Sequence, residues 1–210
     1  IGANFVSKTS SAVEKINILN AILGSIDDGF ITLVIIFISI FVGTDFNLEI
    51  FKNVVSKGFS KGSIYFSKLI ASIYAVTIFL LAVIACSLGI GIIFFEKTSI
   101  STNSILNFTE TILIKILLVF AVVSISVLIT TIIRNVGLSI GINLVVLRVL
   151  PATIITMIPS LSKYEISSTL YKLESFNTSG KILVSGLIIA LAYIIISNAI
   201  GIFTFAKRDI

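Results

Sequence analysis

Residues 45–68 of the chain have the sequence DFNLEIFKNVVSKGFSKGSIYFSK. This is the longest polar, lysine-bearing interval between two segments that are almost wholly apolar. Apolar side chains recur every three to four positions over residues 46–55, which predicts a short amphipathic helix. Gly58 is suited to end that helix, and Ser60 or Ser63 is suited to cap the next one. The stretch therefore predicts an interfacial helix, a turn and the start of a membrane span.

The composition places the chain among membrane proteins. Of its 210 residues, 57% are hydrophobic and 12% are charged, and the mean hydropathy is +1.17. Soluble domains carry about 25% charged residues, so the sequence departs strongly from that class. Apolar runs spaced along the whole length predict an all-α polytopic membrane protein. The net charge of +5 is explained by lysines that hold helix ends at lipid headgroups, so no nucleic-acid partner is expected.

Five apolar runs are candidates for crossing a bilayer. The predicted spans cover residues 29–43, with Ala21 as an alternative start of this first span, and residues 69–95, 109–133, 136–151 and 182–206. Pro151 either kinks the fourth span or ends it, and in the second case residues 152–158 form an apolar piece that dips back into the membrane. We expect residues 1–210 to form a single transmembrane domain that lacks its first span, so that the complete protein would have about six spans.

The distribution of charge predicts the orientation of the spans. Lysine and arginine are densest in residues 44–67, at Arg134 and at the C-terminal end, whereas most acidic side chains lie in the other polar segments. The positive-inside rule therefore predicts that residues 44–67 form a cytoplasmic loop, that the C-terminus is cytoplasmic, and that residues 160–180 form an extracellular loop. Isoleucine is plentiful and lysine outnumbers arginine, which is typical of an AT-rich bacterial genome. We expect a multi-pass protein of a bacterial cell membrane.

Several short motifs in the opening stretch occur together. They are Asp45-Phe46, Lys52-Asn53, Gly58-Phe59-Ser60-Lys61, Ile64-Tyr65 and Lys68, and the chain ends on Phe205, Lys207, Arg208 and Asp209. In this pattern the chain resembles ABC-2-type transporter permeases, especially the small permeases of Gram-positive peptide and lantibiotic export or immunity systems. The family often has Gly-Thr where this chain has Glu49-Ile50, and it usually has Arg where this chain has Lys61.

The resemblance implies a permease without an ATPase of its own. In that family the loop inserts as a coupling helix into a groove of a separate nucleotide-binding subunit. A short helix joined directly to a span can tilt that span. The residues expected to couple to the ATPase are Asp45, Phe46, Glu49, Phe51, Lys52, Val55, Lys57, Gly58 and Lys61. Residues 46–55 would dock, and residues 58–68 would pass the motion to the second span.

The expected partners follow from the same resemblance. The sequence contains no G-x-x-x-x-G-K-[ST] motif, so ATP and Mg²⁺ are expected on the ATPase subunit and no cofactor on this chain. The other expected partners are a second permease copy or a related permease, membrane lipid and an amphipathic substrate. By periodicity alone, an inert helix lying on the headgroups explains the opening stretch equally well.

Two cations lie within apolar runs. Lys115 lies about a turn inside its span, and we expect its amine to reach the headgroups. Arg148 lies ~20 Å into the fourth span, counted from Arg134 at ~1.5 Å per residue, and an intramembrane arginine is a functional candidate. Its side chain either reaches the outer headgroups or pairs with Asp27 or Asp28 to form an external gate or a stabilising lock.

Small residues recur at four-residue spacing in the last two spans. The pairs are Gly137 with Gly141, and Ser197 with Gly201 beside Asn198. Such pairs let helices approach closely, and helix packing is the expected role.

The favoured function is the export of an amphipathic peptide or a lipid-like substrate, powered by a separate ATPase. An ABC-2-type ion or small-drug exporter is the alternative, although ion paths usually contain several ionisable groups. A membrane anchor or sensor and an intramembrane Ser-Lys protease that uses Lys115 are weaker alternatives. The sequence has no His and no H-E-x-x-H motif, so we expect neither a metal site nor enzymatic activity in this chain.

Overall fold

The structure, a computed structural model, describes residues 18–48, 50–94, 102–174 and 179–207. Every regular element in these ranges is helical, as predicted. In chain order the elements are α2 (Ile18–Ser25), α3 (Asp28–Asn47), α4 (Ile50–Ser56), α5 (Lys61–Phe94), α6 (Thr102–Ile133), α7 (Val136–Leu144), the π-helix η1 (Val145–Val149), α8 (Leu150–Met157), the 3₁₀-helix η2 (Pro159–Lys163), α9 (Ile166–Lys172) and α10 (Gly180–Lys207).

Five of the described helical segments are long and apolar enough to cross a membrane. They are Leu19–Asn47, Lys61–Ile93, Ile105–Ile133, Val136–Met157 and Gly180–Phe205. The prediction of five apolar helices of membrane-spanning length is therefore confirmed. The second helix begins at Lys61, eight residues before the predicted start at Leu69. It begins there because Ser60 caps it, with the Ser63 backbone N–H donating to Ser60 Oγ at 3.2 Å.

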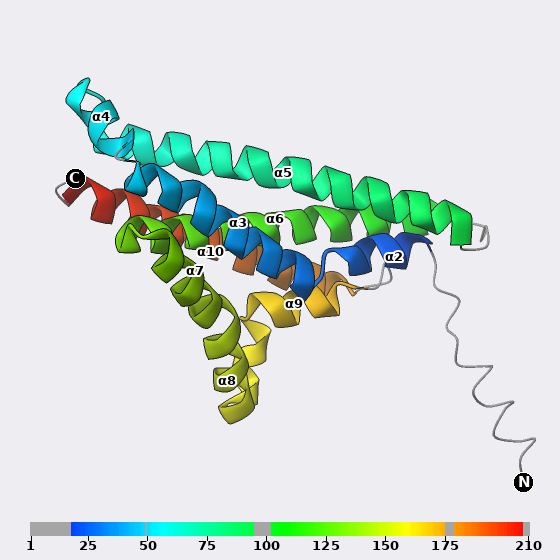
Figure 1. Ribbon diagram of the computed structural model, residues 1–210. Helices are drawn as coiled ribbons and strands as arrows, with labels where there is room; N and C mark the ends of the chain where they lie inside the picture. The colour runs from blue at the N-terminus through cyan, green and yellow to red at the C-terminus, as the bar shows by residue number, and fades with distance from the viewer. Residues whose placement is uncertain (1–17, 49, 95–101, 175–178, 208–210) are drawn as a thin grey trace, which may run out of the picture.

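The helices α3, α5, α6 and α10 run side by side along the molecule, while α7 and α8 diverge from them at an angle (Figure 1). α6 occupies the centre of the bundle. In its apolar, membrane-spanning stretch 56% of the residues are buried, against 17% in the corresponding stretch of α5. It packs most extensively against α10 and also contacts α3, α5 and α7. Because α5 and the fourth span leave most of their apolar surface uncovered, they offer broad faces to lipid or to another protein.

The fourth span continues through Pro151. The elements α7, η1 and α8 follow one another without a break from Val136 to Met157. The backbone N–H of Leu150 donates to the carbonyl of Val145, which is a five-residue, π-type hydrogen bond. Proline lacks an N–H and its ring crowds the carbonyl four residues earlier, so the wider π turn accommodates it. Of the two alternatives for Pro151, the structure shows one continuous span with a local distortion.

Three segments predicted to share one side of the membrane lie at one end of the helix bundle. They are α4, the Arg134 turn between α6 and α7, and the C-terminal end of α10 (Figure 1). Rings from the first and third segments meet, since Phe51 lies 5.7 Å from Phe205. The Arg134 guanidinium lies 5.8 Å from the centre of the Phe46 ring. Arg134 makes the tight turn with a positive φ of 59°, and Asn135 caps α7.

The predicted loop at residues 160–180 contains two helices, η2 and α9. α9 is amphipathic and docks on the bundle through Ile166, Thr169 and Leu170, which are buried. It contacts α6 and α10. α9 is therefore a packed part of the molecule.

Candidate functional site

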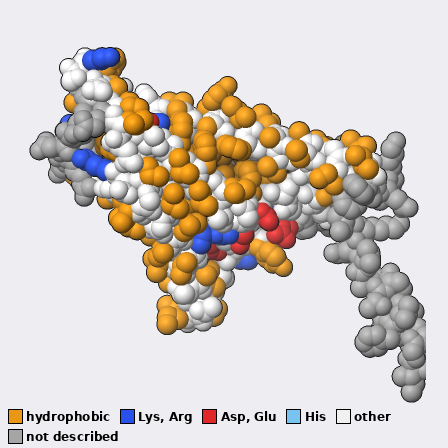
Figure 2. Space-filling model, viewed as in Figure 1, with side chains coloured by type: hydrophobic (Ala, Val, Ile, Leu, Met, Phe, Trp, Pro, Cys, Tyr) orange, Lys and Arg blue, Asp and Glu red, His pale blue; other side chains and the backbone are white. Residues whose placement is uncertain are grey.

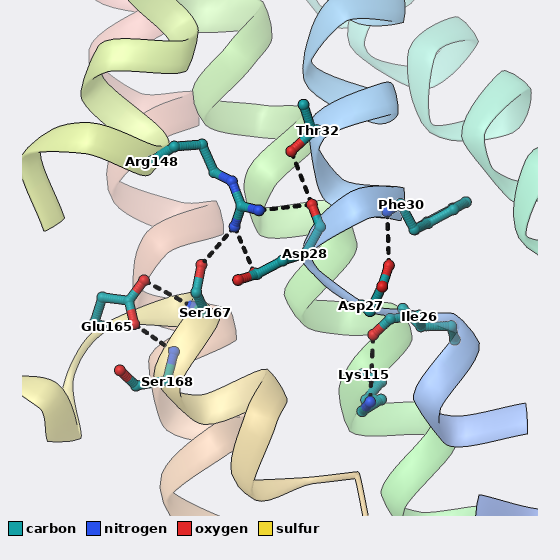
Figure 3. Close-up of polar contacts among 10 residues, drawn as sticks. All are labelled: Ile26, Asp27, Asp28, Phe30, Thr32, Lys115, Arg148, Glu165, Ser167 and Ser168. Carbon is teal, nitrogen blue, oxygen red and sulfur yellow. Dashed lines mark hydrogen bonds and ion pairs between the residues drawn. The ribbon is translucent and has the colours of Figure 1, made fainter. Parts of the chain in front are cut away.

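Arg148 lies beside Asp28, the first residue of α3 (Figure 3). Its Nη1 donates to the Asp28 carboxylate at 2.5 Å, and its Nη2 donates to the Asp28 backbone carbonyl at 2.7 Å. The same Nη1 donates to Ser167 Oγ of α9 at 3.1 Å. One guanidinium therefore ties together the N-terminal end of α3, the fourth span and α9. Of the two candidate partners, Asp28 forms the ion pair, and the gate function stays a prediction.

The other acidic side chains beside this ion pair cap helices. Asp27 accepts a hydrogen bond from the backbone N–H of Phe30 at 2.9 Å and is the N-cap of α3. Glu165 accepts from the backbone N–H groups of Ser167, at 2.8 Å, and Ser168, and is the N-cap of α9 (Figure 3). A carboxylate at a helix N-terminus satisfies free N–H groups and favours the positive end of the helix dipole. Asp27 thus positions Asp28 rather than binding Arg148.

The expectation that Lys115 reaches the headgroups is wrong. Its side chain is fully buried, and Nζ donates to the backbone carbonyls of Leu23 at 2.6 Å and Ile26 at 3.3 Å. These carbonyls lie at the C-terminal end of α2, where a helix has no partners of its own for them. The carboxylates of Glu174 and Asp27 also attract the ammonium. Lys115 therefore holds the break between α2 and α3.

An apolar groove of about 410 Å³ runs between α6, the fourth span and α10. Ile125, Pro151, Ile154 and Ile196 are among the apolar residues that line it. At one end its lining becomes polar, with Tyr164, Glu165, Ser167 and Tyr193. The volume lies within the range of about 300–1,000 Å³ that is usual for ligand sites. We call this cavity the apolar groove.

A second cavity of about 490 Å³, the polar pocket, adjoins the apolar groove. Its charged lining residues are Asp28, Arg148, Glu165 and Lys172, with Ser162 and Ser168 among the hydroxyl groups. The two cavities share Ile155, Glu165 and Ser167 as lining residues. Figure 2 shows acidic and basic side chains gathered on one patch of a face that is otherwise largely apolar. The combined site is apolar along the spans and charged at one end.

The opposite end of the bundle holds the predicted coupling element. Asp45 near the end of α3 forms an ion pair with Lys68 of α5, with a distance of 2.6 Å between Oδ2 and Nζ. Gly58 has a φ of 89°, and its N–H donates to the Val55 carbonyl at 2.9 Å. A positive φ favours glycine, so Gly58 ends α4 as predicted. The predicted order of helix, turn and capped second span is present, but the short helix begins at Ile50 rather than at Phe46, because α3 continues to Asn47.

The apolar face of α4 points into the molecule. Phe51 is only 5% exposed, and its ring lies 4.3 Å from the Phe46 ring. Val54 and Val55 also pack against the core. The expectation that residues 46–55 dock through these apolar side chains therefore needs correction: they bury against the chain itself. Glu49 and the Lys52 side chain lie outside the described part of the structure.

The outward surface of the coupling element is made by other side chains. Its exposed residues include Leu48, Ile50, Asn53, Ser56, Lys57, Gly58 and Phe59, whereas Lys61 is half-buried. Leu48 is 63% exposed and Phe59 is 58% exposed. Of the residues named from the sequence, Lys57 and Gly58 lie on this surface, and Asp45 is engaged with Lys68. Exposed apolar side chains flanking a helix that projects from a bundle are typical of a contact surface.

The sequence analysis missed a buried amide that joins three helices. Asn143 of α7 is fully buried, and its Nδ2 donates to Ser39 Oγ of α3 at 2.9 Å and to Thr130 Oγ1 of α6 at 3.1 Å. Such side-chain bonds hold membrane helices together where lipid offers no hydrogen-bond partner. A lone amide inside an apolar run is the signal that could have identified it.

The small-residue pairs differ in their surroundings. Nothing lies within 4 Å of a Cβ built on Gly141, so the pair with Gly137 makes no close contact within the described part of the chain. A Cβ built on Gly201 would overlap the Tyr65 ring of α5. Asn198, one turn earlier, accepts a hydrogen bond from the Tyr65 hydroxyl at 3.5 Å. The packing expectation is confirmed for Gly201, where α5 and α10 approach each other.

Comparison with known families gives a match over nearly the whole chain. Residues 5–210 match the family described as a protein of unknown function, DUF2705. The chain belongs to this family. No curated protein matched the sequence significantly, and no solved structure matched it either. The family description states no activity.

Proposed function

We propose that this chain is the membrane-spanning permease subunit of an ATP-driven ABC exporter. The observation that carries the proposal is α4, a short helix that projects at one end of the bundle and turns directly into α5 (Figure 1). The Asp45–Lys68 ion pair joins the two spans at the base of this helix. A push on α4 would therefore move α3 and α5 together, which is what a coupling helix requires.

The proposal assigns the α4 end to the cytoplasmic side of a bacterial cell membrane. An ABC ATPase subunit, which carries ATP and Mg²⁺, would bind the outward surface formed by Leu48, Ile50, Lys57 and Phe59. A second copy of the chain, or a related permease, would complete the transport path. The broad uncovered faces of α5 and the fourth span leave room for that contact.

The cargo in this proposal is an amphipathic peptide or a lipid-like molecule. The apolar groove with its charged end supports such a cargo, because each part of an amphipathic molecule would meet a matching surface. Arg148 and Asp28 would act as a gate or a lock at the outer end, since their ion pair joins α3 to the fourth span and Arg148 also reaches α9.

The test is co-purification with a candidate ABC ATPase subunit. The double variant Leu48→Ser, Phe59→Ser removes exposed apolar side chains from the coupling element without touching the buried Phe51. The matched control is Met157→Ser, Ile158→Ser, at the exposed end of α8. We expect the ATPase to co-purify with the unmodified chain and with the control, but not with the double variant. Equal binding of both variants, together with equal ATPase stimulation, would overturn the coupling role.

A further inference from the structure

We propose that the apolar groove and the polar pocket together form a binding site for one membrane phospholipid with an anionic headgroup. One acyl chain lies in the groove, and the phosphate lies in the pocket against Lys172 and Arg148. The two cavities adjoin through shared lining residues, so a single molecule can occupy both. Nothing in the coupling geometry requires this site, and the binding does not depend on an ATPase partner.

One cation of the polar pocket, Lys172, is available to an anionic group. Its two carboxylates are already engaged: Asp28 binds Arg148, and Glu165 caps α9. Lys172 is exposed, and within the described part of the chain no ion pair or hydrogen bond engages its ammonium. The two carboxylates and two cations carry no net charge, but Asp28 and Arg148 engage each other and Glu165 engages backbone N–H groups, so Lys172 is the charged group that stays available to a ligand. A phosphate oxygen is a strong acceptor for such an ammonium and for the hydroxyl groups of Ser162 and Ser168.

The groove favours a lipid over a water-soluble anion. Its walls are formed by apolar residues of α6, the fourth span and α10, all of which are segments of membrane-spanning length. An acyl chain gains little free energy by moving from the bilayer into such a groove, because both surroundings are apolar. The headgroup contacts therefore decide whether a lipid binds, and the pocket supplies them at the charged end of the groove.

The test uses the purified full-length chain in detergent. It is titrated with phosphatidylglycerol and, in a separate experiment, with a monoacylglycerol that has the same acyl chain. Bound lipid is measured by native mass spectrometry. We expect phosphatidylglycerol to be retained and the monoacylglycerol to be released. Lys172→Gln should weaken phosphatidylglycerol binding about tenfold, the loss of one charge-assisted hydrogen bond. The matched control is Lys163→Gln, an exposed lysine of η2 that does not line the pocket.

A second pair of variants tests the groove. Ile196→Phe places a larger side chain into the groove from an exposed position of α10, whereas Ile195→Phe makes the same change on the neighbouring position outside the lining. We expect only Ile196→Phe to release the lipid. Both positions are exposed, so neither change should prevent folding.

Other occupants give distinct results, each of which would overturn the proposal. Equal retention of the monoacylglycerol would show a groove that takes any acyl chain. Displacement by inorganic phosphate, with no effect of Ile196→Phe, would show a free-anion site. A dimer that Ile196→Phe abolishes would show that a second copy of the chain covers the groove. If lipid binds as expected and the ATPase does not, the transporter function fails and the lipid site stands.

Discussion

Asp45 and Lys68, the two residues that bound the opening stretch of sequence, form an ion pair with 2.6 Å between Oδ2 and Nζ. The Asp45 side chain is only 18% exposed and the Lys68 side chain only 15%. Lys68 Nζ also lies 3.6 Å from the centre of the Phe41 ring. The pair closes the base of the coupling element and joins α3 to α5. In the proposed transporter, a force on α4 would therefore reach both spans.

Breaking this ion pair should destabilise the chain and loosen the coupling element. Asp45→Asn leaves the Lys68 ammonium without its counter-charge in a mostly buried site, and Lys68→Met does the same to the Asp45 carboxylate. We expect a double-mutant cycle to give about 0.5–3 kcal/mol of coupling energy in the free energy of unfolding, the range for residues in direct contact. The measurement is unfolding of the purified protein in detergent. Lys57→Met, at an exposed position of the same stretch, is the control and should leave stability unchanged; a coupling energy near zero would contradict the prediction.

Arg148→Gln should separate α9 from α3 with a small cost in global stability. The Asp28 side chain is 61% exposed, so water screens the pair and its loss should cost about 1 kcal/mol or less. Because Arg148 also binds Ser167, the expected local result is faster amide hydrogen exchange in α9. Lys163→Gln is the control on the preceding helix. If α9 exchanges at the same rate in Arg148→Gln and the control, Arg148 does not act as a lock.

Lys115→Met should release the C-terminal end of α2. The substitution keeps a long apolar side chain and removes the bonds to the Leu23 and Ile26 carbonyls. We expect amide exchange in α2 to rise about tenfold, the equivalent of one lost hydrogen bond to a charged group. Lys181→Met, at an exposed position of α10, should leave α2 unaffected. Unchanged exchange in α2 would show that its apolar contacts alone hold it in place.

Gly201→Ala should destabilise the contact between α5 and α10. The added methyl group would overlap the buried Tyr65 ring, and overpacking of this kind costs about 1–3 kcal/mol. Gly141→Ala is a matched change in another membrane-spanning segment where the methyl group meets nothing. We expect a lower unfolding temperature for Gly201→Ala and an equal or higher one for Gly141→Ala. The same unfolding temperature for both would argue against close packing at Gly201.

Local sequence signals predicted the helical elements well. The short helix α4, its end at Gly58 and the cap at Ser60 follow from patterns within a few residues, and the structure contains all three. The spans were underestimated at their ends, since α5 continues back to Lys61. The π-helix before Pro151 was anticipated only as a kink. Its π-type bond depends on how the neighbouring turns adjust to the proline ring.

The candidate site was predictable only in part. Arg148 and Asp28 were named from the sequence because a charge inside an apolar run demands a partner. Asp27, the adjacent acid, could not be told apart from Asp28 until the start of α3 fixed which carboxylate caps the helix. Ser167 and Lys172 carry no signal of their own, since they lie in a segment that the sequence describes only as polar.

The sequence by itself determined that the described chain is helical, that five segments are apolar and long enough to span a membrane, and where the largest polar interruption lies. Water is absent from a bilayer core, so backbone groups there must bond within the segment, and apolar length therefore specifies a helix. Only the tertiary structure decided which face of each helix meets the protein, because lipid-facing and protein-facing surfaces are both apolar and give the same pattern. The inward packing of Phe51, the burial of Lys115 and the groove beside Arg148 all depend on helices that are distant in sequence and adjacent in space.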